Sequence, residues 1–263
     1  METRLDDRVA LVTGAGSGIG KATALLLAEQ GARVAALSRT RDELEKVVAE
    51  IEGQGGEGLV VVADISKPDE MEAAISKVIE TWGRLDIVFA NAGINGAWAA
   101  IEDLKPEEFQ KTMDVNVLGT FLTLKYSVPH LKKQGRGAIV ITSSVNGTRK
   151  FSLSGATAYA GSKAAQVAMA KMLALELADA RIRVNVICPG AITTQIDENT
   201  TRRNLDEIGE PVEFPEGNIP LTDGEPGSSQ DVAQLVLFLV SDASSHITGT
   251  PVWIDGGETL LQG

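Results

Sequence analysis

The chain has 263 residues, of which 43% are hydrophobic, and this is enough to build one sizeable buried core. Its formal net charge of −12 argues against nucleic acid as a partner, because an acidic surface repels phosphate backbones. The one cysteine, Cys188, allows no intrachain disulfide, and with only two histidines no cluster of metal ligands is visible in the sequence.

The N-terminal stretch METRLDDRVALVTG has no basic region followed by a long apolar run, so it does not read as a signal peptide. The longest apolar runs, such as residues 235–240, are far too short to span a bilayer. We therefore expect a cytoplasmic protein with no membrane partner and no bound metal.

Short apolar runs alternate with helix-like stretches along the chain. Seven of these runs are interpreted as strands: residues 8–12, 32–37, 58–63, 86–90, 138–142, 183–187 and 252–254. Their apolar character on both faces is typical of parallel strands that helices cover on both sides. Because strands and helices alternate, the sequence predicts an α/β fold, a doubly wound (Rossmann) seven-stranded parallel sheet in a single domain spanning residues 1–263.

A glycine-rich loop follows the first strand directly. Gly14, Gly18 and Gly20 are spaced T-G-x-x-x-G-x-G, and the next helix begins at this loop. Glycine lets a phosphate approach the backbone closely, and a helix N-terminus offers free N–H groups and a positive dipole end. An ordinary turn is the alternative, but the position in the first βα unit favours dinucleotide binding.

The end of the second strand usually meets the adenosine ribose. Ser38 stands where NAD proteins often carry an acidic residue, and Arg39 follows it. A hydroxyl beside a guanidinium suits a 2′-phosphate, so we predict NADP, with NAD as the other possibility. The alternative is that Arg39 and Arg41 only cap the strand and solvate the next helix.

The third and fourth strands end in further candidate cofactor contacts. The carboxylate of Asp64 can accept from an adenine amino group and Ile65 can cover the ring, although an Asp after a strand is more often a turn residue. Asn91 and Gly93 lie in the motif NAG, where the chain would pass close to a cofactor. By itself this motif also reads as a turn.

Tyr159 and Lys163 are four residues apart on a helix expected over residues 158–178, so they share one face. A nearby ammonium lowers the pKa of a phenol from about 10, and such a phenol can pass a proton to a carbonyl oxygen that receives hydride. Alone, the pair would be an ordinary surface pair. Ser143 and Ser144 follow the fifth strand at the ligand edge of the sheet, where a hydroxyl can stabilise charge on that oxygen.

The motifs TGAGSGIG, NAG, NVLGTF, SS, YAGSK, PGAITT and WIDGG occur in this order and cover nearly the whole chain. Together they resemble the short-chain dehydrogenase/reductase family of the single-domain type. The resemblance implies a catalytic tetrad of Asn116, Ser144, Tyr159 and Lys163. In the family the tyrosine is the acid/base, the lysine lowers its pKa and binds the nicotinamide ribose, the serine orients the carbonyl, and the asparagine holds a water that links the lysine to solvent.

The resemblance and the motifs together imply a cofactor site along the carboxyl edge of the sheet. By resemblance, Pro189 shapes the chain after the sixth strand, and Ile192 and Thr194 face the nicotinamide carboxamide. The full set of candidate cofactor-binding residues is Gly14, Ser17, Gly18, Ile19, Gly20, Ser38, Arg39, Asp64, Ile65, Asn91, Gly93, Tyr159, Lys163, Pro189, Gly190, Ile192 and Thr194. The family also implies a homotetramer, with the Asn116 and Tyr159 helices packed between subunits.

Two departures from the family pattern concern the site. The usual NNAG is ANAG here, although Asn91 is retained. Ser144 precedes Tyr159 by two positions more than is common, which leaves a choice between the two serines, and we favour Ser144. The longer stretch adds Arg149 and Lys150 near the cleft mouth. They could attract an anionic substrate, but we interpret them as solvated loop cations outside the site.

The segment of residues 193–227 breaks the alternation and is rich in Asp, Glu, Pro, Gly and Asn. It follows the sixth strand, where the family carries its substrate loop, so we expect a lid rather than a tolerated surface excursion. Trp98 either lines the same pocket or is partly exposed packing.

We therefore predict an NADP(H)-dependent oxidoreductase that moves a hydride between the cofactor and a small secondary alcohol or ketone, with Tyr159 passing the proton. The alternatives are an NAD-dependent dehydrogenase of the same fold acting on a sugar or hydroxyacyl substrate, a lyase or epimerase that uses NAD transiently, and a redox sensor without turnover. A sugar, a steroid, a 3-oxoacyl thioester and a cyclic ketone all stay open as substrates.

Overall fold

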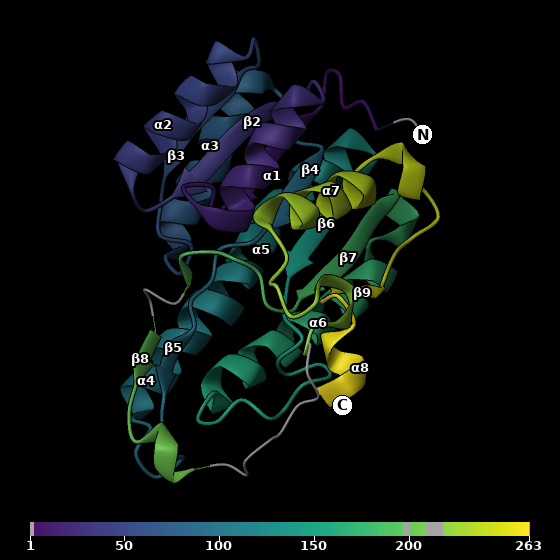
Figure 1. Ribbon diagram of the computed structural model, residues 1–263. Helices are drawn as coiled ribbons and strands as arrows, with labels where there is room; N and C mark the ends of the chain where they lie inside the picture. Colours follow the sequence, from purple (N-terminus) through teal and green to yellow (C-terminus); the bar gives the residue numbers. More distant parts are fainter. Residues whose placement is uncertain (1–2, 197–199, 209–217, 263) are drawn as a thin grey trace.

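The computed structural model describes residues 3–196, 200–208 and 218–262. A seven-stranded parallel sheet forms its centre (Figure 1), built from β1 (Val9–Thr13), β2 (Arg33–Ser38), β3 (Gly58–Val62), β4 (Ile87–Ala90), β6 (Gly137–Thr142), β7 (Ile182–Pro189) and β9 (Pro251–Ile254). The predicted α/β fold with seven parallel strands is confirmed, and each predicted strand differs from the observed one by at most two residues at an end.

The strand order is β3-β2-β1-β4-β6-β7-β9, and every neighbouring pair is parallel. The chain first moves outward from β1 to β3 and then crosses back to place β4 on the other side of β1. The strand order therefore reverses between β1 and β4. In open parallel sheets the crevice at such a point, beyond the carboxyl ends of the strands, is where ligands bind.

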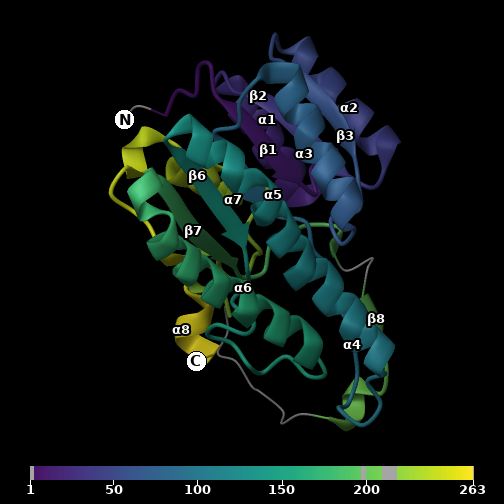
Figure 2. The same cartoon turned by 180° about the vertical axis from the view of Figure 1, so that it is seen from behind.

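Helices cover both faces of the sheet, as Figures 1 and 2 show from opposite sides. One face carries α1 (Gly18–Glu29), α2 (Arg41–Gly53) and α7 (Ser229–Val240), and the other carries α3 (Pro68–Trp82), α5 (Gly119–Gln134) and α6 (Thr157–Glu176). Successive strand residues point to opposite faces. In β1, Ala10 and Val12 accordingly pack into one core, while Val9 and Leu11 pack into the other.

A small projection extends from the carboxyl side of the sheet. It contains a two-stranded parallel sheet of β5 (Gly96–Trp98) and β8 (Thr200–Arg202), beside α4 (Pro106–Met113). The sequence did not predict this sheet, because three-residue strands about a hundred residues apart carry no readable periodicity. Within the predicted lid of residues 193–227, residues 197–199 and 209–217 lie outside the described part of the chain.

The remaining described elements are short: the π-helix η1 (Asp114–Leu118), the 3-10 turns η2 (Ala178–Ala180), η4 (Leu205–Glu207), η5 (Pro220–Thr222) and η6 (Asp242–Ser244), and the helix α8 (Glu258–Gln262). None of the described helices is both long enough and apolar enough to cross a bilayer. Over the same residues, no group of three or more His, Cys, Asp or Glu side chains is arranged to hold a metal ion.

Candidate active site

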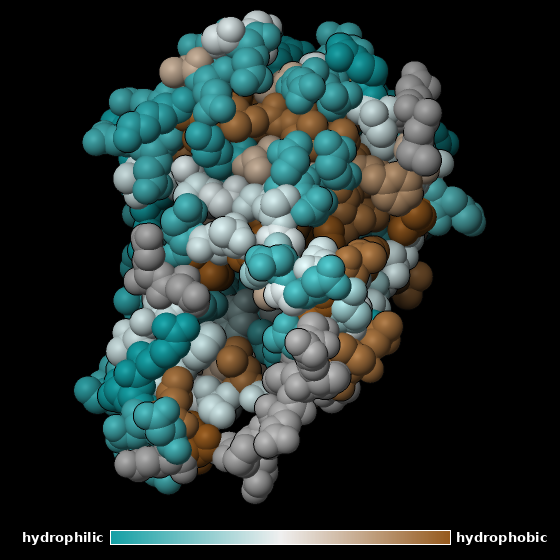
Figure 3. Space-filling model, viewed as in Figure 1, coloured by the Kyte–Doolittle hydropathy of each residue, from teal (hydrophilic) through white to brown (hydrophobic). Residues whose placement is uncertain are grey.

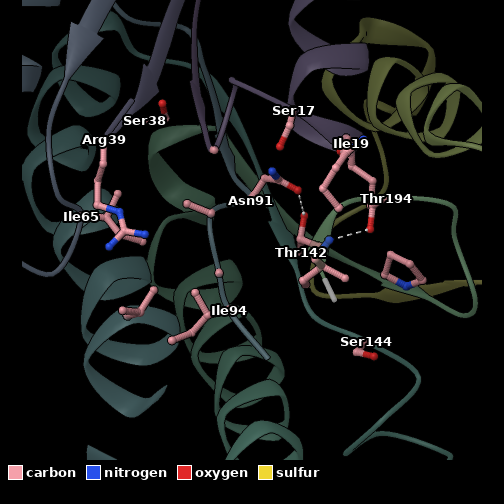
Figure 4. A pocket seen from close by; sticks show the side chains of 18 of the residues that line it. Ser17, Ile19, Ser38, Arg39, Ile65, Asn91, Ile94, Thr142, Ser144 and Thr194 are labelled. Atoms are coloured by element: carbon pink, nitrogen blue, oxygen red, sulfur yellow. Dashed lines mark hydrogen bonds between the residues drawn. The ribbon is translucent and has the colours of Figure 1, made fainter. Parts of the chain in front are cut away.

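A cleft of about 450 Å³ opens at the carboxyl edge of the sheet, on the hollowed face seen in Figure 3. Ser38 and Arg39 lie at one end of it and Ser144 at the other (Figure 4). All but two of the predicted site residues line this cleft: Gly14, Ser17, Gly18, Ile19, Ser38, Arg39, Asp64, Ile65, Asn91, Gly93, Ser144, Tyr159, Lys163, Pro189, Gly190, Ile192 and Thr194. The two exceptions are Gly20 and Asn116, which lie behind the cleft wall.

The glycine loop between β1 and α1 has no room for a side chain at Gly14 or Gly20. Gly14 has a φ of 68°, and a Cβ there would lie 3.0 Å from the amide nitrogen of the Asn91 side chain. A Cβ on Gly20 would lie only 2.0 Å from the carbonyl oxygen of Gly14, which explains why Gly20 supports the loop without lining the cleft. Because α1 begins at Gly18, its free N–H groups face the cleft, as a bound pyrophosphate requires.

At the Ser38 end of the cleft, a local hydrogen bond restrains the backbone, and Arg39 is the cation that lines the cleft. The Ser38 hydroxyl accepts from the Thr40 N–H at 3.2 Å. Arg41 pairs with Glu45 at 3.6 Å, whereas Arg39 lines the cleft and makes no ion pair within the described residues. Glu43, which the sequence analysis did not single out, lines the same end.

Asp64 is both a turn residue and part of the cleft wall. Its Oδ1 accepts from the Ser66 N–H at 2.9 Å and from the Ser66 hydroxyl at 2.7 Å. Partial burial acts to raise the pKa of this carboxyl, but the Ser66 hydrogen bonds and the nearby Arg39 and Lys67 bring the pKa below its ordinary value. Asp64 is therefore ionised at neutral pH beside the cleft, and Ile65 lies next to it.

Asn91 ties the ends of three strands together. Its backbone N–H donates to the Thr13 hydroxyl at 2.9 Å, and its side-chain amide donates to the Thr13 carbonyl at 3.1 Å. The Thr142 hydroxyl donates to Asn91 Oδ1 at 3.1 Å (Figure 4), so β1, β4 and β6 meet at this side chain. The ANAG departure leaves these bonds intact. Thr13 and Thr142 were not predicted as site residues, although Thr13 is the first residue of the motif TGAGSGIG and Thr142 directly precedes the two serines.

The two serines after β6 have different surroundings. The Ser143 hydroxyl donates to the backbone carbonyl of Lys163 at 2.8 Å and is buried. The Ser144 hydroxyl accepts from the Asn146 N–H at 3.1 Å and lies beside the Tyr159 phenol, where hydrogen bonding acts to lower the phenol pKa. Ser143 therefore anchors α6, and Ser144 is the serine whose hydroxyl is hydrogen-bonded to the Tyr159 phenol.

Tyr159 and Lys163 lie four residues apart on the side of α6 that faces the cleft, and both are almost fully buried. Lys163 Nζ donates to the Thr142 carbonyl at 3.0 Å and lies 5.5 Å from the centre of the Tyr159 ring. Burial lowers the pKa of Lys163 to about 8. Burial also raises the pKa of Tyr159, and the opposing Ser144 hydrogen bond is the smaller effect. The predicted lowering of this phenol pKa by Lys163 is absent, because the ammonium is directed to Thr142.

Asn116 lies in the π-helix η1 and acts on the cleft wall from behind. Its Oδ1 accepts from the Ile94 N–H, and its Nδ2 donates to the Ile94 carbonyl and to the Ser162 hydroxyl, all at 2.9 Å. It is fully buried. The asparagine therefore joins the segment after β4 to α6, immediately beside Lys163. A π-turn of this kind is frequent at functional sites.

Of the two cations of the 148–150 stretch, Arg149 is exposed, as expected, whereas Lys150 is partly buried in an ion pair, so the interpretation of Lys150 as a solvated cation was wrong. The Arg149 guanidinium lies 3.6 Å from the centre of the Trp253 ring. Lys150 Nζ lies 2.6 Å from Glu258 Oε1, and only 5% of that glutamate side chain is exposed. Both cations hold the loop after β6 to the C-terminal part of the chain, and neither lines the cleft.

Trp98 neither lines the cleft nor is partly exposed. It is buried and packs against Ala156 and Tyr159, with Leu153 and Leu205 around them. The sequence carried no signal for this cluster, because its members come from three separate segments.

Comparison with known proteins agrees with this geometry. Residues 14–259 match the protein family described as Enoyl-(Acyl carrier protein) reductase. The chain belongs to the short-chain dehydrogenase/reductase family. It is 39% identical to a 3-oxoacyl-[acyl-carrier-protein] reductase of Thermotoga maritima over 97% of this chain and 98% of the relative, and 36% identical to a cyclohexanol dehydrogenase of an Acinetobacter species over 98% of each. This short-chain dehydrogenase/reductase is accordingly an oxidoreductase that acts on CH–OH groups.

Solved structures of the family are close in shape. A 3-ketoacyl-ACP reductase from Sinorhizobium meliloti has a TM-score of 0.94 and 57% identity, covering 96% of this chain and 99% of that one. A Brucella melitensis reductase complexed with NADH has a TM-score of 0.85 and 32% identity, covering 97% and 99%. A Burkholderia cenocepacia gluconate 5-dehydrogenase with NADP and tartrate has a TM-score of 0.86 and 27% identity, covering 98% of each. Both nicotinamide dinucleotides therefore occur in relatives of this fold.

Proposed function

We propose that the protein transfers a hydride between NADP(H) and a secondary alcohol or ketone. The observation that carries this proposal is a single cleft with Arg39 at one end and Ser144, Tyr159 and Lys163 at the other. The residues present fit a dinucleotide, because Gly14 and Gly18 line the cleft without a Cβ and α1 begins at this point of the cleft wall.

Each end of the cofactor has residues suited to hold it. Arg39 and Ser38 would bind a 2′-phosphate, and Ile65 would cover the adenine beside the ionised Asp64. Asn91 and Gly93 would lie along the middle of the cofactor. At the nicotinamide end, the candidate contacts are Pro189, Gly190, Ile192 and Thr194. When bound, the cofactor supplies the hydride that is donated or accepted.

The proton is proposed to pass through Tyr159. In the reductive direction, the phenol donates its proton to the carbonyl oxygen as that oxygen gains charge, and the Ser144 hydroxyl donates a hydrogen bond to the same oxygen. Lys163, with a pKa of about 8, is mostly protonated at pH 7, so its charge is available to a ribose hydroxyl. Asn116 positions α6 through Ser162 rather than contacting substrate.

NAD stays the second candidate cofactor. Glu43 lines the same end of the cleft as Arg39 and could accept from a ribose hydroxyl. A guanidinium with no ion pair among the described residues, set beside a serine hydroxyl, supports NADP over NAD, because a 2′-phosphate would meet a positive charge there.

The surroundings of the cleft support a substrate that is uncharged at its reacting end. The two cations of the loop after β6 and the two at β8 are all in contact with other side chains: Arg149 with Trp253, Lys150 with Glu258, Arg202 with Trp98 and Arg203 with Glu108. A cyclic ketone satisfies this condition, and so does the 3-oxo group of a 3-oxoacyl thioester. The similarity to 3-oxoacyl reductases makes the thioester the first substrate to test.

We propose further that residues 1–263 form a single domain in which residues 193–227 are the lid.

We also propose that the protein is cytoplasmic and assembles as a homotetramer. Large hydrophobic side chains are exposed on α5 at Phe121 and on α6 at Met172 and Leu175, which supports burial of these helices between subunits. Light scattering coupled to size-exclusion chromatography tests the assembly, and a monomer would contradict it.

The test of function is nicotinamide absorbance with NADPH or NADH and a panel of a 3-oxoacyl thioester, cyclohexanone and a ketose. Tyr159→Phe is expected to reduce turnover by about a hundredfold or more while cofactor binding persists. Tyr126→Phe, which changes the chain's other tyrosine outside the cleft, is the matched control and should retain activity. Tight NADPH binding without turnover of any panel member would favour a redox sensor, and failure of both cofactors to bind would overturn the proposal.

A further inference from the structure

The β8 segment (residues 200–205) is docked onto the projection by several independent contacts. Its strand pairs with β5 so that Trp98 lies opposite Arg202, and the Arg203 N–H donates to the Trp98 carbonyl at 3.0 Å. The Arg203 guanidinium donates to both carboxylate oxygens of Glu108, at 2.7 and 2.8 Å, and to the Asp103 carbonyl. A bidentate pair of this kind fixes orientation as well as position.

Trp98 connects this docked segment to the candidate catalytic tyrosine. On one side the Arg202 guanidinium lies 4.9 Å from the centre of the Trp98 ring, within cation–π range. On the other side Trp98 packs in one buried cluster with Tyr159 and Ala156. The indole N–H donates to the Asn95 carbonyl at 3.3 Å, which restrains the ring orientation. Trp98 itself does not line the cleft, so its contribution is not contact with a ligand in that cleft.

The stretch before α6 completes the same cluster. The Ala99 N–H donates to the Gly155 carbonyl at 3.2 Å, and the Ser154 hydroxyl donates to the Ile208 carbonyl at 3.2 Å. A Cβ on Gly155 would lie 2.7 Å from Leu205 Cδ2. Three segments distant in sequence are thus packed tightly around the first turn of α6, where Tyr159 lies.

We propose that Trp98 is a positioning residue that couples docking of the β8 segment to the orientation of Tyr159. With β8 docked, Arg202 and the strand pairing hold Trp98, and Trp98 holds the tyrosine ring in its buried orientation. Undocking β8 removes that support and leaves the dinucleotide end of the cleft unchanged. This inference rests on the proposed function only where it concerns turnover.

The kinetic test uses Trp98→Ala, Trp98→Phe and Arg202→Ala with the best substrate of the panel. Trp98→Ala should lower kcat by about tenfold to a hundredfold with the NADPH dissociation constant within about twofold of wild type, because misplacing the proton donor slows the chemical step. Trp98→Phe should recover most of kcat. Adding Arg202→Ala to Trp98→Ala should lower kcat little further, because both act through one contact. Trp82→Ala, on α3, is the control for loss of a tryptophan.

A second test needs no substrate and separates this inference from the proposed function. Coupling is reciprocal, so removing the tyrosine ring should loosen β8. Trypsin cleavage after Arg202 and Arg203, followed by mass spectrometry, should be at least about tenfold faster in Tyr159→Ala than in wild type. Tyr159→Phe retains the ring and should stay protected, although it loses turnover. Cleavage at the wild-type rate in Tyr159→Ala, or an unchanged kcat in Trp98→Ala, would overturn the coupling.

Discussion

Lys150 and Glu258 form an ion pair across 108 residues of sequence, with Lys150 Nζ 2.6 Å from Glu258 Oε1. The other carboxylate oxygen of Glu258 accepts from the Ala191 N–H at 3.3 Å. One buried glutamate therefore joins the loop after β6, the segment after β7 and the helix α8. The first two of these carry Ser144 and the candidate nicotinamide contacts.

Removing one member of this pair should destabilise the protein. Lys150→Met is expected to lower the free energy of unfolding by about 3 kcal/mol, because it leaves a buried carboxylate without its cation. Adding Glu258→Gln should restore part of the loss, since glutamine is neutral and still accepts from the Ala191 N–H. Urea unfolding measures both, with Lys132→Met, an exposed lysine without an ion pair among the described residues, as control. Equal effects of the two lysine substitutions would contradict the assignment.

Lys163 should reduce stability at neutral pH. Its pKa is about 8 in the folded protein against 10.5 ordinarily, so the unfolded chain binds more protons between these values, and stability rises with pH across that window. Lys163→Met is therefore expected to be more stable than wild type by about 2–3 kcal/mol at pH 7, with the gap closing between pH 8 and 10.5. Thermal unfolding of the two proteins across this pH range measures the gap, and a pH-independent difference would contradict it.

The identity of the dinucleotide should depend on Arg39. Arg39→Ala is expected to lower kcat/KM for NADPH by about tenfold to a hundredfold, as loss of a charge-assisted hydrogen bond implies, with little effect on NADH. Ser38→Asp, added to it, should favour NADH through the ribose hydroxyl and repel the 2′-phosphate. Arg41→Ala, whose guanidinium pairs with Glu45 outside the cleft, serves as the control. Equal losses with both cofactors in Arg39→Ala would argue for NAD instead.

The glycine loop should tolerate no side chain at Gly20. A Cβ there would lie 2.0 Å from the Gly14 carbonyl oxygen, so Gly20→Ala must displace the loop. We expect cofactor affinity, followed by quenching of tryptophan fluorescence, to fall by about a hundredfold, which corresponds to about 3 kcal/mol of strain. Gly53→Ala, where no atom lies within 4 Å of the added Cβ, should bind cofactor normally. Normal binding by Gly20→Ala would show that the loop can move without cost.

The sequence predicted the central sheet because each of its strands is a continuous apolar run between helical patterns. The sequence also predicted that Tyr159, Lys163 and Ser144 lie at one edge of the sheet. The carboxyl ends of parallel strands meet at that edge, and residues four apart share one face of a helix. The sequence could not predict the β5–β8 pairing or the Trp98 cluster, which depend on contacts between short segments far apart in the chain.

The direction of the Tyr159 pKa shift was also beyond the sequence. The four-residue spacing predicted that Tyr159 and Lys163 share one face of the helix. It could not predict that Lys163 donates to the Thr142 carbonyl or that both side chains are buried. The roles of Arg149 and Lys150 were missed for a related reason. Their partners, Trp253 and Glu258, lie about a hundred residues later and follow no motif that pairs with them.

The contacts of Glu258 with Lys150 and with the Ala191 N–H also determine which parts of the chain can fold first during translation. The residues of the glycine loop and of β1 to β4 leave the ribosome early, and this half of the sheet can begin to fold while translation continues. The loop bearing Ser144 cannot reach its final anchor until residue 258 has emerged from the exit tunnel. A nascent chain stalled before that point would hold a formed nucleotide-binding half and an unfinished catalytic half.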